Sequence, residues 1–144
     1  MFSPQLSIRA GRANPFVNAY RQVANETAVA AASPHRLIEM LFDGCMDALA
    51  QARGALRSGQ LEVKGRALGR AARIVDEGLR AALDMRDGGI LAADLHALYG
   101  YLTMRLTAAN LKNDEAAIEE CQRLLSPLRD AWHAIGPQVE GARR

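Results

Sequence analysis

The sequence is poor in the residues that mark several classes of protein. It has only two cysteines and three histidines in 144 residues, and its aromatic content is 5%. Cys45 and Cys121 are far apart and form no disulfide framework or zinc motif, so we expect two buried thiols in a reducing compartment. Alanine and leucine are abundant in contrast, and this composition favours helices.

A strong charge imbalance and a long apolar run are also missing. The 18 basic and 16 acidic residues nearly cancel, which argues against a dedicated nucleic-acid-binding domain. No segment reaches the roughly 18 consecutive apolar residues of a membrane span. The first residues, MFSPQLSIRAGR, lack the apolar centre of a secretory signal. We therefore expect a cytoplasmic protein with no membrane span.

Motifs for catalysis and cofactor binding are missing as well. The sequence contains no phosphate-binding loop, no dinucleotide-binding glycine pattern and no nucleophile elbow. His35, His96 and His133 are scattered, and a single Asp130-x-x-His133 pair is too few ligands for a metal-binding bundle. Glu39 and Asp43 share a helix face but have no partner pair for acid–base chemistry. We predict neither an enzyme nor a cofactor or metal site.

What the sequence does contain is four long stretches with the apolar period of a helix. We predict a single all-α domain, an antiparallel up-down four-helix bundle with a short N-terminal helical cap or strap. The predicted segments are a flexible tail at 1–15, a bundle domain at 16–137 with a cap at about 16–24 and helices at about 34–57, 61–85, 90–112 and 114–135, and a frayed C-terminus at 138–144.

The helix boundaries follow from local signals. Ser33-Pro34 and Ser58-Gly59 bracket the first helix, and Asn113-Asp114 separates the third helix from the fourth. Gly136-Pro137 predicts the end of the fourth helix. Pro127 lies inside that helix and predicts a kink, because proline removes one backbone hydrogen bond.

The third predicted helix is apolar on two sides. One side, expected to face the core, carries Leu91, Leu95, Leu98, Leu102, Leu106 and Ala109. The other side carries Tyr101, Met104, Ala108 and Leu111. One apolar side is enough for a bundle, so the second predicts an interaction site, which we place in a groove between the second and third helices.

Other interpretations of this second side stay open. It could be covered by the N-terminal strap, or it could form a weak homodimer in a general helical adaptor or self-associating bundle. A separate row of arginines lies on the second helix and consists of Arg66, Arg70, Arg73 and Arg80. It is either a solvated face or a docking site for an acidic partner or a nucleic acid.

Five short stretches together resemble the FliS family of flagellar secretion chaperones. They are Asn18-Ala19-Tyr20-Arg21-Gln22, Ser33-Pro34-His35-Arg36-Leu37-Ile38, Met40-Leu41-Phe42-Asp43-Gly44, Leu98-Tyr99-Gly100-Tyr101-Leu102 with Arg105-Leu106 and Ala109-Asn110, and Leu128-Arg129-Asp130-Ala131-Trp132. The stretches occur in one order over about residues 18–132. The sequence departs from the family pattern in its longer N-terminal tail and in Pro127.

This resemblance implies a function. Members of the family bind the C-terminal segment of flagellin, prevent premature polymerisation and deliver the subunit to the flagellar type III export apparatus, with an export-gate protein as a further partner. The disordered client segment folds partly into helices on the bundle. The predicted flagellin-binding residues are Tyr20, Gln22, Ile74, Met85, Tyr101, Met104, Ala108, Asn110 and Leu111.

Overall fold

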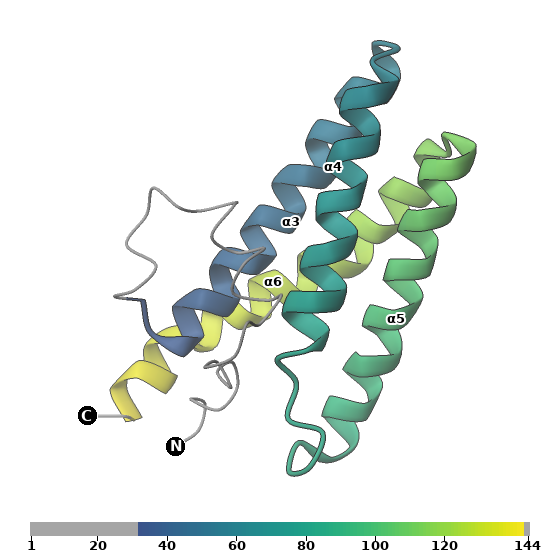
Figure 1. Cartoon of the computed structure of the whole chain (residues 1–144). Helices are drawn as coiled ribbons and strands as arrows, with labels where there is room; N and C mark the ends of the chain where they lie inside the picture. Colours follow the sequence, from purple (N-terminus) through teal and green to yellow (C-terminus); the bar gives the residue numbers. More distant parts are fainter. Residues whose placement is uncertain (1–31, 143–144) are drawn as a thin grey trace.

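The described part of the chain forms an antiparallel bundle of four long helices (Figure 1). The computed structural model describes the backbone of residues 32–142 and the side chains of residues 32–136. No strand occurs in this part of the chain, and the predicted all-α class is confirmed. The predicted tail at 1–15 and cap at 16–24, with Tyr20 and Gln22, lie outside the described residues.

Helix α3 spans Pro34–Arg57. The Ser33 hydroxyl caps it by accepting a hydrogen bond from the backbone N–H of Arg36 at 3.1 Å, which satisfies one of the free donors of the first turn. Ser58 is the C-cap of this helix, and Gly59 follows in the left-handed region with φ 76°. Both ends of α3 therefore follow from the local sequence signals.

The second helix differs from its prediction. Helix α4 covers Leu61–Arg73 and continues as a π-helix, η3, over Ile74–Arg80. The predicted helix to residue 85 is wrong, because the helical segment ends at Arg80 and Met85 lies in the turn that follows. A π-turn takes more residues than an α-turn, and here it places Ile74, Val75 and Leu79 in the core together.

Helix α5 covers Gly89–Lys112 and packs between η3–α4 and α6. It ends at Asn113, which adopts the left-handed conformation with φ 51°. Asp114 then accepts a hydrogen bond from the backbone N–H of Ala117 at 3.2 Å and so caps the next helix. This two-residue turn reverses the chain tightly, as Asn113-Asp114 predicts.

Helix α6 runs over Glu115–Ala142, through Pro127 and beyond Gly136-Pro137. The predicted end of this helix near residue 135 is therefore wrong. The predicted frayed C-terminus is wrong for residues 138–142, which are helical. Gly136 serves a packing role instead. It is buried, and a Cβ atom added there would lie 2.7 Å from Nε2 of His35, closer than normal van der Waals contact.

The bundle closes around one core, with each helix packed on two neighbours: α3 on α4 and α6, and α5 on α4 and α6. Leu41, Leu49, Leu68, Leu102 and Leu106 are among its fully buried side chains. None of the helices in the described part of the chain is long and apolar enough to cross a membrane.

Polar contacts join the first and last helices of the bundle. Arg57 Nε donates to Glu115 Oε2 at 2.7 Å, and Arg53 Nη2 donates to the same oxygen at 2.9 Å. These two hydrogen bonds hold the pKa of Glu115 below its ordinary value. At the other end, the ring of His35 stacks on Trp132 with centroids 4.6 Å apart, and the Trp132 indole N–H donates to the His35 carbonyl at 3.0 Å.

Candidate functional site: the outer face of helix α5

Helix α5 buries only one of its apolar sides. Leu102, Leu106 and Ala109 are at most 1% exposed and belong to the core. Leu91 was expected on this side, but it is exposed. The buried stripe begins instead at Ala92.

The opposite side of α5 is left largely exposed by the other described helices. We call it the α5 outer face and define it as Ile90, Ala97, Tyr101, Met104, Ala108 and Leu111. Leu111 is 81% exposed, Ile90 80%, Met104 59% and Tyr101 38%, and Ala108 is partly buried. Several large apolar side chains in one row on a surface mark an interaction site more often than isolated ones do.

The spacing of this face is that of a helix-packing seam. Its residues, together with Asp94, recur at alternating steps of three and four, and Ile90, Ala97, Met104 and Leu111 are seven residues apart. Such a repeat lets a second helix pack along the first. From Ile90 to Leu111 the seam is about 30 Å long at ~1.5 Å per residue. Our sequence-based prediction missed Ile90 and Ala97, although the seven-residue spacing was visible.

Tyr101 is anchored at the edge of the α5 outer face. Its hydroxyl donates to Glu120 Oε2 of α6 at 2.7 Å, and Arg105 Nε donates to the other oxygen of Glu120 at 2.8 Å. The two hydrogen bonds lower the pKa of Glu120, and the contact with the carboxylate raises the pKa of Tyr101. The ring is therefore held in one orientation while part of it stays exposed.

Asn110 is used inside the bundle. Lys64 of α4 is buried, and its ammonium donates to the Asn110 side-chain oxygen at 2.7 Å and to the Asn110 carbonyl at 2.8 Å. This places a positive charge at the C-terminal end of α5, where the helix dipole and unpaired carbonyls are negative. Both oxygen atoms of Asn110, a predicted flagellin-binding residue, are therefore engaged within the bundle.

Two further predicted site residues, Ile74 and Met85, do not lie on the α5 outer face. Ile74 is 1% exposed, so it belongs to the core and offers no surface to a partner in this conformation. Met85 is exposed in the turn before α5, beyond the Ile90 end of the outer face. The face thus brings together Tyr101, Met104, Ala108 and Leu111 from the predicted set.

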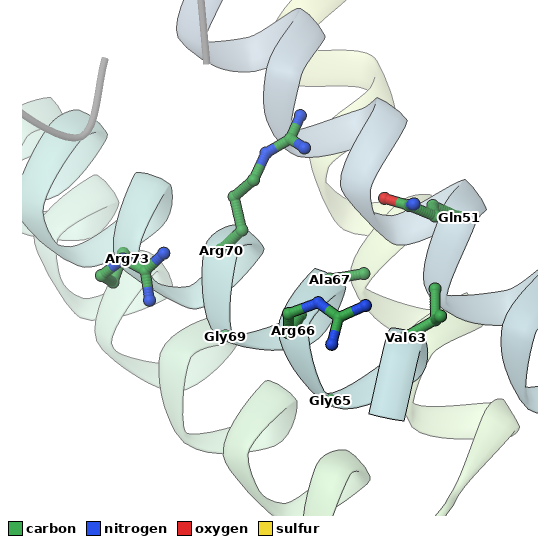
Figure 2. Close-up of a pocket in the computed structure, with 8 residues that line it drawn as sticks. All are labelled: Gln51, Val63, Gly65, Arg66, Ala67, Gly69, Arg70 and Arg73. Carbon is green, nitrogen blue, oxygen red and sulfur yellow. The ribbon is translucent and has the colours of Figure 1, made fainter. Parts of the chain in front are cut away.

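The structure has a surface hollow on the second helix, and the predicted groove between the second and third helices stays a prediction. A surface hollow of ≈430 Å³ lies on α4, lined by residues of that helix and by Gln51 of α3. Arg66, Arg70 and Arg73 line it, as Figure 2 shows. Arg80 leaves the row: it donates to Asp76 at 3.0 Å and to His96 Nε2 at 3.2 Å.

The two cysteines and His133 are the side chains most often used in catalysis or metal binding, and here they are buried or paired with acidic residues. Burial raises the pKa of the Cys45 thiol to about 12 and that of Cys121 to about 11, so neither is a thiolate near neutral pH. His133 Nδ1 lies 2.6 Å from Glu39 of α3 and its Nε2 lies 3.5 Å from Asp43. Within residues 32–136, no three histidine, cysteine or acidic side chains are placed to hold a metal ion.

Comparisons with known proteins converge on one family. The family model described as "Flagellar protein FliS" matches residues 16–139. The chain is 51% identical to the flagellar secretion chaperone FliS of Salmonella typhimurium, over 85% of this chain and 91% of the relative. It is 44% identical to the flagellar secretion chaperone FliSB of Pseudomonas aeruginosa, over 81% of this chain and 91% of the relative.

A more distant relative agrees. The flagellar secretion chaperone FliS of Bacillus subtilis is 34% identical, over 83% of this chain and 84% of the relative. The matches span both the buried stripe and the outer face of α5, because they cover most of the bundle. The predicted resemblance is confirmed: this chain belongs to the FliS family, whose members named above are flagellar secretion chaperones.

Proposed function

We propose that this protein is a cytoplasmic export chaperone that binds the C-terminal segment of flagellin on the α5 outer face. Bound there, the segment is kept from polymerising until the subunit reaches the flagellar type III export apparatus, where an export-gate protein receives the complex. The protein acts by binding alone and carries out no catalysis. The name of its relatives, flagellar secretion chaperone, supports the general role.

The observation that carries the proposal is the seven-residue spacing of exposed apolar side chains on α5. A helical client segment of about 20 residues matches a seam of roughly 30 Å. Burying the seam contributes about 25 cal/mol per Å² of apolar surface, and ordering the client offsets part of this gain. Binding is then strong enough to mask the segment and weak enough to allow release.

Calorimetry with a peptide from the C-terminus of flagellin of the same cell tests the proposal directly. We expect one peptide per chaperone and a negative heat-capacity change, because apolar surface is buried on binding. The free peptide should gain helical circular dichroism in the complex. Absence of binding by the full chain would contradict the proposal.

Self-association through the same face is the alternative that the exposed seam also supports. Sedimentation equilibrium of the full chain separates the two. A monomer that becomes a one-to-one complex with the peptide supports the chaperone. A tight dimer that dissociates on Met104→Glu and ignores the peptide supports a self-associating bundle.

A further inference from the structure

A second recognition surface lies on α4. We define the α4 arginine row as Arg66, Arg70 and Arg73, which recur at steps of four and three and so share one side of the helix. The hollow of ≈430 Å³ on this helix is lined by all three arginines. The row spans about 10 Å along the helix axis at ~1.5 Å per residue.

The charges of this row are largely uncompensated. Arg66 has only a distant pair with Glu62, at 4.0 Å. Arg70 and Arg73 have no ion pair with any residue in the described range 32–136, and Nε of Arg70 is buried there without a hydrogen-bond acceptor. Like charges one turn apart repel each other on a helix, so a bound anion would relieve a repulsion that the fold itself leaves in place.

The shape of the surface admits a polypeptide. Gly65 and Gly69 lie beside the arginines, and a Cβ atom added at either position would contact nothing closer than 3.7 Å. The surface is therefore open at these two positions, because no side chain fills them. Figure 2 shows the Arg70 side chain reaching from α4 toward α3, which carries Gln51. The lining residues of the hollow come from α4 and α3 and include none from α5, whereas the proposed flagellin-binding seam is on α5.

The surrounding charges favour a short acidic segment over a nucleic acid. Glu62 lies before the row and Asp76 after it, so the positive surface along α4 is limited to the three arginines and is too short to follow a continuous phosphate backbone. The whole chain carries a net charge of only +2, too little for the multiple phosphate contacts that dominate nucleic-acid affinity. Guanidinium groups pair with carboxylates through two parallel hydrogen bonds, so two or three clustered carboxylates fit the row.

We propose that the α4 arginine row docks an acidic segment of a protein other than flagellin, and that it does so while the α5 outer face holds its client. The two surfaces belong to different helices and share no residue. The chaperone then joins a client and a second, acidic partner in one complex. This inference concerns a partner beyond the proposed flagellin binding and is tested separately from it.

The test uses a fluorescent glutamate-rich peptide as the probe and the same peptide with glutamine in place of glutamate as its control. We expect the glutamate peptide to bind the full chain by anisotropy and the glutamine peptide not to bind. The double variant Arg66→Glu with Arg73→Glu should weaken binding about tenfold or more, because two charge-assisted contacts are reversed. Its far-ultraviolet circular dichroism should match that of the parent protein.

Arg123→Glu is the matched control for the charge change. Arg123 is 65% exposed with a Glu119 pair at 4.0 Å, and Arg66 is 68% exposed with a Glu62 pair at 4.0 Å. We expect Arg123→Glu to change affinity by no more than about twofold, as for an isolated surface charge. An equal loss in Arg123→Glu and Arg66→Glu single variants would overturn the proposal, since it would reveal a non-specific charge effect.

Two competition experiments complete the test. A flagellin C-terminal peptide should leave the glutamate probe bound, and displacement would assign the arginine row to the client and overturn the proposal. A DNA duplex should bind more weakly than the probe at the same ionic strength. Tighter duplex binding that the double variant abolishes would make the row a nucleic-acid site and would overturn the proposal too.

Discussion

Substitution of Met104 tests the α5 outer face most directly. Fully burying a methionine side chain contributes about 1.5–3 kcal/mol, and Met104 is 59% exposed in the free protein. Covering the remainder on binding is therefore worth about 1–2 kcal/mol. Met104→Ala should weaken binding of the flagellin peptide by roughly five- to twentyfold, at tenfold per ~1.4 kcal/mol.

Met104→Glu should weaken binding further, because a carboxylate would have to leave water inside an apolar contact. Folding should be almost unchanged, since Met104 is exposed and glutamate is about as good a helix former as methionine. Calorimetry with the flagellin peptide measures the binding, and urea denaturation measures the free energy of unfolding for the same samples.

Ala50→Glu is the control for this substitution. Ala50 is exposed on α3, which packs against α4 and α6 and lies diagonally across the bundle from α5. The Ala50→Glu substitution adds the same carboxylate away from the predicted seam and should leave the affinity for the flagellin peptide unchanged. Unaltered binding by both Met104 variants would refute the assignment of the α5 outer face as the client site.

The remaining predictions concern stability, measured by urea denaturation. Gly136→Ala should lower the free energy of unfolding by about 1–3 kcal/mol through overpacking against His35, whereas Gly54→Ala, which meets nothing within 4 Å, should raise it by up to ~1 kcal/mol. Contacts with Arg57 and Arg53 lower the pKa of Glu115 below its ordinary value of 4.5. They therefore stabilise the fold above that pH, and the contribution is lost as the pH falls through the lowered pKa. In Glu115→Gln the free energy of unfolding should fall less steeply as the pH is lowered. Lys64→Met should cost about 1–3 kcal/mol, because the C-terminal end of α5 loses its buried donor.

The bundle itself was predictable because its signals are local. Ser33-Pro34 and Asn113-Asp114 act through neighbouring backbone groups, and the structure shows both caps formed. The apolar period of each long stretch predicts a helix wherever the helix stays α-helical. These two kinds of signal suffice for four helices with short turns.

Predictions failed where a distant contact overrides the local pattern. The π-turn after Arg73 places Ile74 in the core, which a 3.6-residue period cannot foresee. Gly136 resembles a helix terminator, yet it lies inside α6, where the His35 ring leaves no room for a side chain. Asn110 looks available on a helix surface, but its oxygens accept hydrogen bonds from Lys64, 46 positions earlier.

Sequence alone determined that α5 has more apolar surface than one core uses, because side-chain type and helical period are properties of the chain itself. Only the tertiary structure decided which apolar residues of α5 stay exposed. Burial depends on where α4, η3 and α6 end relative to α5, so Leu91 became exposed, and Ile90 with Met104 and Leu111 became one row. The same packing left Arg70 and Arg73 uncompensated on α4 while Arg80 found Asp76, because ion pairs depend on distances that no spacing in the sequence specifies.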